Sequence, residues 1–577
     1  MPNTTTPDKH QAWERAQAVL LLLVALFSLL YFFSNISADL IRAGEARAAE
    51  IAREMLERGN FVLPSLNYDV SKESLTKPPL YHWLLIITSA TPDWPNWAVR
   101  LTSILASLGT IWMTFLCGSR MFSFRAGVYS ALVLSTCIVF LENSSAARMD
   151  IFFSFLILAS VYCFWMAINS EPGSRWVYGF YILSGLGVLT KGPIGILFPV
   201  LVAMLLTLGN PNARSWRELR PINGVLIFLM VVLPWYLLLY LTAPGNLAFN
   251  FLFGQLAHWW AGSSNVAASG GKPFHYYLPH VLVGFFPWSL FLPAALVIGV
   301  RAVRREGDAA IKSMLVWFLG GLILFSLGGK KAARYLLPIM APFAMIMGFY
   351  FDRIRAGVSR RHGLVLNISS ILVVLFTSVL VLLLAGVLTE SEWVVKGLFK
   401  GQQKGGASTL SAVIAMLQGH PLAAASGLGL MLIASVLALV GNFRRHTNLM
   451  IFGLAAVIWT LVWPYSLTIK PALQQQMSPR AAAEKIAGML PQDAVLYGGG
   501  KAYQHSMRWY LERNIELEGP DQLYNRVLQE PDSWVLLMEK KPLREKLQAS
   551  ERKKLQWQIE YYYVTLFPGL ELKSVER

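Results

Sequence analysis

The sequence has few charged residues and few cysteines for its length. Only 14% of its 577 residues are Asp, Glu, Lys or Arg, whereas a soluble globular domain has about 25%. This deficit excludes an ordinary soluble multidomain protein, because most of the chain lacks the charged surface that faces water. The three cysteines, Cys117, Cys137 and Cys163, all fall in apolar runs. They support neither a disulfide framework nor a zinc site, and we expect them to be small core residues.

Apolar residues are abundant instead, at 55% of the chain. They form runs close to the roughly 17–25 residues that cross a bilayer as a helix. We therefore predict a polytopic α-helical membrane protein with about thirteen spans. The first run, residues 18–33, is expected to be retained, because no small-x-small cleavage site follows it. The other predicted spans lie near residues 98–117, 125–142, 150–168, 176–190, 193–208, 222–243, 278–300, 313–328, 335–351, 363–388, 422–441 and 449–468.

The net charge of +17 comes from basic residues spread between the apolar runs. This dispersion argues against a nucleic-acid-binding function and is typical of cytoplasmic loops rich in Lys and Arg. With the N-terminus inside, arginines fall in five inside loops, near residues 120–125, 214–220, 301–312, 353–361 and 444–445. Thirteen crossings then place the C-terminal segment outside.

The composition becomes polar from about residue 470. We predict a transmembrane domain over residues 1–469 and a small soluble α/β domain over residues 470–577. Ser478 and Pro479 are typical of the start of a helix, with Ser as the N-cap. Strands are expected at residues 494–497, 533–538 and 559–566.

Gly498-Gly499-Gly500-Lys501 has the look of a phosphate-binding loop. It lacks the upstream Gly at the required spacing and has Ala502 where Ser or Thr is needed. We therefore interpret this stretch as a turn.

The first outer loop, about residues 35–95, contains an expected amphipathic helix over residues 44–59. Ala48, Ile51, Ala52 and Met55 share one face, and Gly59 is a plausible C-terminal stop. We expect this helix to lie along the membrane surface. The basic residues Arg53, Arg58 and Lys72 of the same loop are interpreted as ordinary solvated charges.

Other basic residues on the outer side stand at breaks between spans. Lys77 begins Lys77-Pro78-Pro79-Leu80, where two prolines set a helix start. Lys191 lies in Thr190-Lys191-Gly192-Pro193, and Arg334 with Tyr335 lies just before the tenth span. Cations that converge from several loops are suited to binding a phosphate. Further candidates for the same cavity are Arg47, Lys330, Lys331, His258 and His275.

Two carboxylates, Glu45 and Asp150, are candidates for catalysis at the outer surface. Ionisable residues at the membrane edge are functional hypotheses by default, and two carboxylates facing one cavity can share base and acceptor-orienting roles. The alternative for Asp150 is a favourable interaction with the dipole of the helix that it begins. For His258 and His275 the alternative is an aromatic interfacial belt. No acidic partner at a telling spacing supports a metal site there.

In order along the chain, six motifs resemble those of membrane glycosyltransferases that use polyprenyl-phosphate sugar donors, the GT-C class. The nearest branch unites protein O-mannosyltransferases with bacterial lipid A aminoarabinose transferases. The motifs are Glu45-Ala46-Arg47 with Ala49–Leu56, Lys77-Pro78-Pro79-Leu80, Met149-Asp150, Leu189–Pro193, Pro273–Pro279 and Arg334–Pro338. Two positions depart from the pattern. Gly44 stands where the family usually has its catalytic Asp, and Thr76 stands where the aminoarabinose branch tends to have a Glu.

The resemblance implies a glycosyltransferase of the bacterial inner membrane, with a cytoplasmic N-terminus and a periplasmic C-terminal domain. It would move a sugar from undecaprenyl phosphate to a lipid A-type acceptor. Lys77, Lys191, Arg334 and Tyr335 would bind the donor phosphate, and Glu45 or Asp150 would serve the acceptor. Besides donor and acceptor, the expected partners are membrane lipids and no nucleic acid. No cofactor is required, and the Thr76 position leaves a divalent metal unsupported although compatible.

Three alternatives remain open from the sequence. The same chemistry could act on a protein or another glycan. A secondary transporter is a different class, but such proteins commonly show internal repeats around a midplane site, and no clear repeat is seen. A non-catalytic membrane protein is the third, with Gly44 marking lost activity.

Overall fold

The structure is a computed structural model. It describes residues 7–64, 77–89, 94–171, 174–207, 220–243, 251, 272–329, 331–355, 360–388, 421–471, 474, 478–489, 495–499, 504–512, 515–517, 534–537, 559–561 and 564–567. Two compact units emerge. Unit 1 comprises Met1–Ile36, Lys77–Tyr81 and Arg100–Leu473, and unit 2 comprises Ser37–Thr76, His82–Val99 and Gln474–Arg577. The first outer loop thus groups largely with the C-terminal segment, and residue 469 as a domain boundary stays a prediction.

Unit 1 is a bundle of apolar helices. Eight helices in the described part of the chain are long and apolar enough to cross a membrane, or up to ten if each of two bent pairs is one span. A multi-pass helical membrane protein is therefore confirmed, whereas the number thirteen stays a prediction. The helices are α1 (Pro7–Phe33), α4 (Asn96–Met121), α5 (Phe124–Ser135), α6 (Ile138–Ser144), α7 (Met149–Asn169), α8 (Trp176–Lys191), α9 (Ile194–Thr207), α10 (Pro221–Thr242), α13 (Tyr277–Gly284), α14 (Leu292–Glu306), α15 (Ala309–Leu327), α16 (Leu337–Arg355), α17 (Arg360–Leu388), α20 (Pro421–Phe443) and α21 (Thr447–Pro464).

The two bent pairs interrupt spans that the sequence predicts as continuous. α5 and α6 meet at 68°, and the segments Phe274–Gly284 and Trp288–Glu306 meet at 110°. At the first break, the Thr136 hydroxyl donates to the Leu132 carbonyl, and the indole nitrogen of Trp288 donates to that hydroxyl over 2.9 Å. The Thr136 hydroxyl and the Trp288 indole are thus satisfied inside the protein, as the membrane interior requires.

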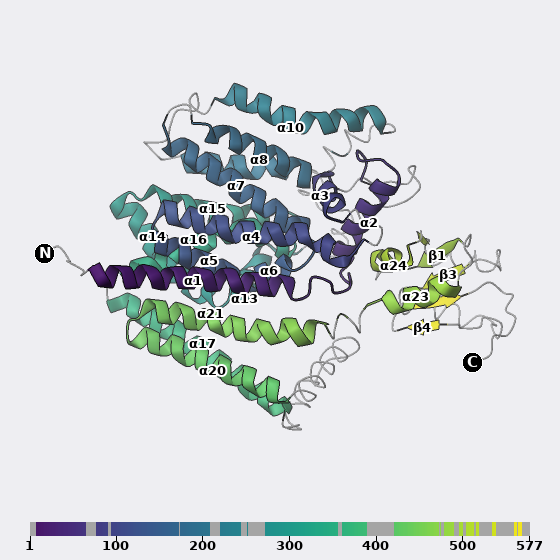
Figure 1. Ribbon diagram of the computed structural model, residues 1–577. Coiled ribbons are helices and arrows are strands. Elements are labelled where there is room, and N and C mark those ends of the chain that lie inside the picture. The colour runs from purple at the N-terminus through teal and green to yellow at the C-terminus, as the bar shows by residue number, and fades with distance from the viewer. Residues whose placement is uncertain are drawn as a thin grey trace. The chain divides into compact units, whose positions relative to one another are not determined.

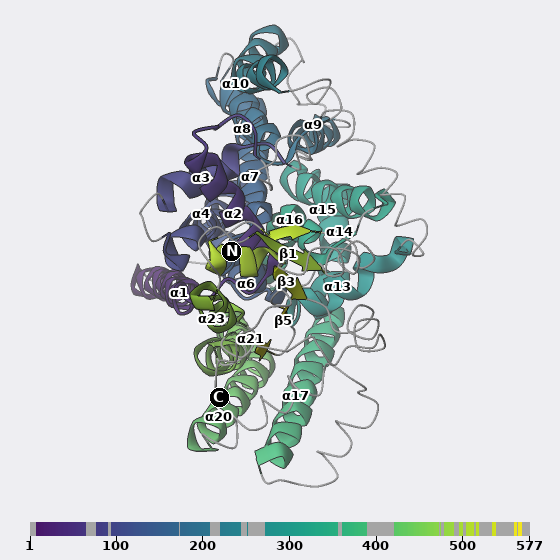
Figure 2. The ribbon, with the colours of Figure 1, turned by 90° about the vertical axis from the view of Figure 1, so that its right-hand side faces the viewer.

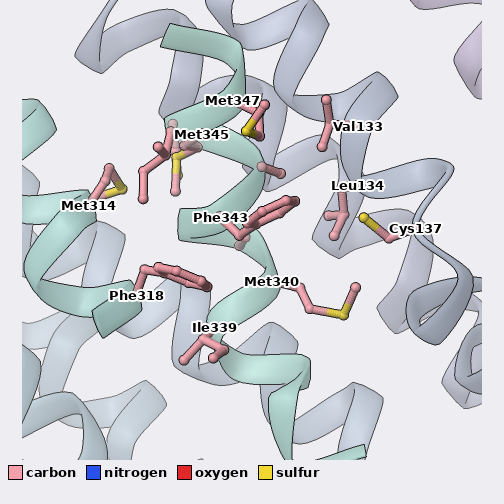
Figure 3. Packing of buried hydrophobic residues seen from close by; sticks show 14 of the residues in the cluster. Val133, Leu134, Cys137, Met314, Phe318, Ile339, Met340, Phe343, Met345 and Met347 are labelled. Carbon is pink, nitrogen blue, oxygen red and sulfur yellow. The ribbon is translucent and has the colours of Figure 1, made fainter. Parts of the chain in front are cut away.

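The core of unit 1 lies around α16. Figure 3 shows Phe343, Met340 and Met345 of this helix among side chains of α5 and α15, and all three are fully buried. α15 and α14 contact α16, and Figure 2 shows the three helices side by side. The cysteines Cys117, Cys137 and Cys163 are buried and free, which confirms their predicted role as core residues.

In unit 2, α2 (Ala43–Glu57) forms where the sequence predicts an amphipathic helix. Ala48, Ile51, Ala52 and Met55 are all at most 5% exposed. Gly59, whose φ is +64°, lies just beyond the last residue of the helix and terminates it. Gly59 N donates to the Leu56 carbonyl, and Asn60 N donates to the Met55 carbonyl. This is the Schellman arrangement that favours glycine. The expectation that α2 lies along the membrane surface stays a prediction.

The polar face of α2 is also buried, against α24 (Gln504–Leu511). Glu50 pairs with Arg508 over 2.7 Å and with the His505 ring nitrogen over 3.1 Å. Arg53 donates to the Trp509 carbonyl over 3.1 Å, and its guanidinium lies 4.7 Å from the centre of the Trp509 ring. The interpretation of Arg53 as a solvated charge is therefore wrong. A helix that faces protein on both sides carries no sequence signal that distinguishes its second face from a solvated one.

In the described part of unit 2, five strands form a sheet in the order β2-β1-β3-β5-β4. Its strands are β1 (Leu496–Gly499), β2 (Ile515–Leu517), β3 (Trp534–Leu537), β4 (Ile559–Tyr561) and β5 (Val564–Phe567). β1 is parallel to β2 and β3, whereas β5 is antiparallel to β3 and β4. A mixed sheet with intervening helices agrees with the predicted α/β character.

The sheet differs in several details from the strands that the sequence predicts. The predicted strand 559–566 is two antiparallel strands, and β2 was not predicted. Gly498 and Gly499 lie in β1, paired with Leu536 and Leu537 of β3, so the predicted turn is wrong at these positions. The helix predicted after Ser478 is confirmed as α23 (Arg480–Met489), where the Ser478 hydroxyl accepts from Arg480 N over 3.1 Å.

Candidate active site

Asp150 lies in the first turn of α7, where its negative charge interacts favourably with the positive end of the helix dipole. The backbone before it is held by Ser103 of α4, whose hydroxyl accepts from Arg148 N over 2.9 Å. The hydroxyl of Tyr81 lies 2.8 Å from the same Ser103 oxygen. The start of α7 is therefore fixed by side chains from two other helices, α4 and α3 (Leu80–Ser89).

Lys191 is the last residue of α8, which packs along α7 (Figure 1). Its ammonium lies 2.5 Å from Asp150 Oδ1 and 4.9 Å from the ring centres of Phe153 and Tyr335. A lysine ammonium over aromatic faces gains a cation–π interaction while keeping its charge. The lysine is thus held in one place from three sides.

Arg334 and Tyr335 lie in a short 3-10 helix, η4 (Ala333–Leu336), that leads into α16. Arg334 Nε lies 3.3 Å from Asp150 Oδ2, and its guanidinium lies 5.5 Å from the centre of the Tyr335 ring. Asp150 therefore bridges two cations, one through each carboxylate oxygen. We call Asp150, Lys191, Arg334 and Tyr335 the Asp150 cluster.

Burial within the Asp150 cluster is graded. The Asp150 side chain is 9% exposed, that of Lys191 16% and that of Arg334 41%. Arg148 adds another favourable charge interaction with Asp150. The carboxylate is thus surrounded by cations, and the outermost of these, Arg334, is open to a ligand. A phosphate that reaches Arg334 would compete with Asp150 for the same donors.

Lys77 lies half-buried at the start of α3, in the Lys-Pro-Pro-Leu motif. Tyr81, four residues further on, holds Ser103 as described above, and its ring lies 6.3 Å from that of Phe152 on the first turn of α7. The motif and the start of α7 are therefore joined by direct contacts.

Lys331 contributes to the site differently from its predicted role. Its ammonium donates to the Lys272 carbonyl over 3.1 Å, and the Lys272 ammonium donates to the Lys331 carbonyl over 2.9 Å. The hydroxyl of Tyr277 accepts from Ala332 N over 3.3 Å. These bonds tie the chain before η4 to α13 and so fix the approach to Arg334. Lys272 and Tyr277 were not predicted as positioning residues, although Tyr277 stands within the aromatic Pro273–Pro279 motif and Lys272 immediately precedes it.

Glu45 and Arg47 belong to unit 2, in the first turns of α2, and are not members of the Asp150 cluster. Glu45 is only 1% exposed. Burial lowers the pKa of the Arg47 guanidinium from its ordinary value, and the nearby Glu50 acts in the opposite direction. The catalytic role of Glu45 stays a prediction.

The remaining candidates contribute less. His275 is exposed in η2 (Phe274–Tyr276) and takes no part in the contacts within the Asp150 cluster. Lys330 and His258 lie outside the described residues. Among the residues that the structure describes, no group of three His, Cys, Asp or Glu side chains could hold a metal ion. The predictions on cofactor and metal stay untested.

Gly192 places Lys191 through its backbone conformation, with φ +82° and ψ −159°. This region is essentially restricted to glycine, so Gly192→Ala is expected to cost about 1–3 kcal/mol. We expect a lower melting temperature of the purified protein in detergent. Gly429→Ala is the control, because a Cβ at Gly429 meets nothing within 4 Å. Equal melting of wild type and Gly192→Ala would contradict the role given to this residue.

Comparisons with known proteins agree with this architecture. The model of the dolichyl-phosphate-mannose-protein mannosyltransferase family matches residues 17–251. An undecaprenyl phosphate-alpha-4-amino-4-deoxy-L-arabinose arabinosyl transferase from Pseudomonas fluorescens is 28% identical over 332 residues, 56% of each chain. Its counterpart from Pseudomonas aeruginosa strain UCBPP-PA14 is 30% identical over 367 residues, 62% of this chain and 63% of the relative. The chain thus spans somewhat over half the length of these relatives.

Solved structures show the fold over nearly the whole chain. ArnT from Cupriavidus metallidurans, bound to undecaprenyl phosphate, is similar with a TM-score of 0.75 at 19% identity, over 95% of this chain and 97% of that one. The archaeal oligosaccharyltransferase AglB from Archaeoglobus fulgidus is similar with a TM-score of 0.53 at 12% identity, over 90% and 69% of the two chains. The predicted resemblance is confirmed: this chain is a multi-pass membrane protein of the GT-C glycosyltransferase fold, related in sequence to the aminoarabinose and protein mannosyl transferases.

Proposed function

We propose that this protein transfers a sugar from a polyprenyl phosphate, undecaprenyl phosphate in bacteria, to a lipid A-type acceptor. The observation that carries the proposal is the bridging of Lys191 and Arg334 by Asp150 at one end of the helices. Two cations held at fixed positions, one of them exposed, are suited to a phosphate group. The names of the relatives and of the solved ArnT structure agree with such a donor.

The location follows from the same hypothesis. The enzyme would lie in the bacterial inner membrane, with its N-terminus in the cytoplasm and the Asp150 cluster at the periplasmic side. The arginine-rich loops predicted to be cytoplasmic support this orientation.

In the reaction, the bond between the sugar's anomeric carbon and the phosphate oxygen breaks, and its electron pair stays on the phosphate. An acceptor oxygen attacks the same carbon from the opposite face, so the configuration inverts. Lys191 and Arg334 stabilise the charge that develops on the leaving phosphate, which is where preorganised donors contribute most to rate. Lys77 adds a third cation, and Tyr335 orients Lys191 and Arg334 through its ring.

Asp150 is assigned a positioning role in this scheme. Each of its oxygens is engaged by a cation, one by Lys191 and one by Arg334, and its side chain is only 9% exposed, which favours a positioning role over contact with an acceptor hydroxyl. Glu45 remains the candidate for orienting the acceptor. A phosphate oxygen on a lipid A-type acceptor is already ionised and requires no strong base, which would make Gly44 tolerable where relatives of this class usually have Asp.

The function is tested with purified protein, undecaprenyl-phosphate-linked aminoarabinose and lipid A. We expect transfer by the wild type and none by Lys77→Ala, because the donor phosphate loses one of its cations. Arg305→Ala serves as the control, because Arg305 is an exposed cation in the last turn of α14 and is not a member of the Asp150 cluster. No transfer by the wild type to lipid A, protein or glycan acceptors, together with counter-flow of a labelled solute in proteoliposomes, would instead support a transporter.

A further inference from the structure

Unit 2 contains a cavity of about 420 Å³ that the proposed transfer chemistry does not use. Its size is within the roughly 300–1,000 Å³ of small-molecule sites. It is lined by side chains from α2, α23, α24 and the start of α4. The cavity lies wholly within unit 2.

Aromatic rings form much of the cavity wall. Trp94, Trp97, Trp509 and Tyr510 all line it. The indole of Trp97 is exposed, at 43%. Trp94 and Trp509 meet edge to face, with ring centres 6.1 Å apart. Trp94 has a φ of +40°, a conformation that a bulky residue adopts only where its surroundings impose it. The rings therefore present flat apolar surfaces that the fold holds in place.

The charged groups at the cavity neutralise one another. Arg480 pairs with Glu484 over 2.9 Å and with Asp39 over 3.6 Å. Arg53 lies 3.9 Å from Glu512. The two guanidinium groups are thus matched by carboxylates, and the described residues that line the cavity have no excess positive charge for a phosphate. It offers both hydrogen-bond donors and acceptors to a neutral ligand.

This combination excludes a lipid chain, since the arginine and glutamate groups would lose water without gaining hydrogen bonds. A sugar matches both features, because its ring has an apolar C–H face and its edge is lined by hydroxyls. We propose that the cavity binds a neutral glycan segment of the acceptor. The binding of a glycan is inferred from the cavity alone. The assignment of that glycan to the acceptor rests on the proposed function.

Binding at this site would hold an acceptor through a part that does not react. Binding energy from remote groups can be used to orient the reacting ones. The site would therefore favour glycan-bearing acceptors over short ones, without changing the chemistry at the Asp150 cluster.

The experiment measures binding of neutral hexose and heptose tri- and tetrasaccharides to the full chain in detergent, by saturation-transfer NMR. We expect at least one to bind, and Trp97→Ala to weaken it about tenfold, a difference of about 1.4 kcal/mol. Trp112→Ala is the matched control, because Trp112 lies on the same helix, is 54% exposed and does not line the cavity. Glu484→Gln, a conservative change at the exposed rim, should also weaken binding.

Each outcome decides the proposal. Selective loss in Trp97→Ala and Glu484→Gln supports it, even if the transfer assay fails, so the two hypotheses are separable. No binding by the wild type, or equal binding by wild type and both variants, overturns it. Binding of inorganic phosphate that is lost in the same variants would also overturn it, because the cavity would then be a site for anions and not for a neutral glycan.

Discussion

Replacement of Lys191 with methionine is expected to lower the transfer rate by about 10²–10³, the usual effect of removing one donor from a charge-stabilising site. The ammonium is 2.5 Å from Asp150 Oδ1 and is enclosed by two aromatic rings. Methionine fills a similar volume without the charge. Because the positive charge is needed most as the phosphate leaves, kcat should fall more than KM rises. Steady-state kinetics with a saturating acceptor measure both.

Lys191→Arg is the companion variant, since it keeps the charge but changes its geometry. We expect partial activity from it and nearly none from Lys191→Met. Comparable melting temperatures for the two variants would show that the fold is intact. Wild-type kcat in Lys191→Met would remove this lysine from the mechanism.

Asp150→Asn is expected to have two opposite effects. The neutral side chain no longer competes for Lys191 and Arg334, so undecaprenyl phosphate should bind more tightly than to the wild type. Turnover should fall strongly, because the two cations lose their fixed positions and the phosphate product leaves slowly. Without ligand, stability should also fall, toward the lower end of the roughly 3–5 kcal/mol found for breaking buried ion pairs, since Arg334 is 41% exposed.

The pH dependence separates positioning from base catalysis at Asp150. If Asp150 only positions cations, Asp150→Asn leaves the shape of the pH–kcat profile unchanged while lowering its height. If the variant instead loses a limb of the profile and binds the lipid phosphate no more tightly, Asp150 is a general base and our assignment is wrong.

Local features of the fold could be predicted because their causes are local. Gly59 ends α2 in the conformation that glycine favours, and Ser478 caps α23 as its residue type indicates. The apolar face of α2 follows from helical periodicity. Lys191 was noted because it stands at a break between two apolar runs.

Features that depend on tertiary contacts were beyond prediction. The sequence predicts that Lys191, Arg334 and Asp150 serve one site, but nothing in it indicates that Asp150 pairs directly with Lys191, 41 residues away, and with Arg334 at the same time. The burial of Arg53 depends on α24, which supplies the Trp509 carbonyl and ring. The break of the span at Thr136 depends on Trp288, which is 152 residues away.

Binding of undecaprenyl phosphate to the purified protein tests the phosphate-binding role of the Asp150 cluster most directly. Native mass spectrometry would compare wild type, Lys191→Met and Arg334→Gln at equal lipid concentrations. We predict a stable complex with the wild type and clear loss in both variants, with Arg305→Ala unchanged. Equal retention of the lipid by all four proteins would contradict a phosphate site at Lys191 and Arg334.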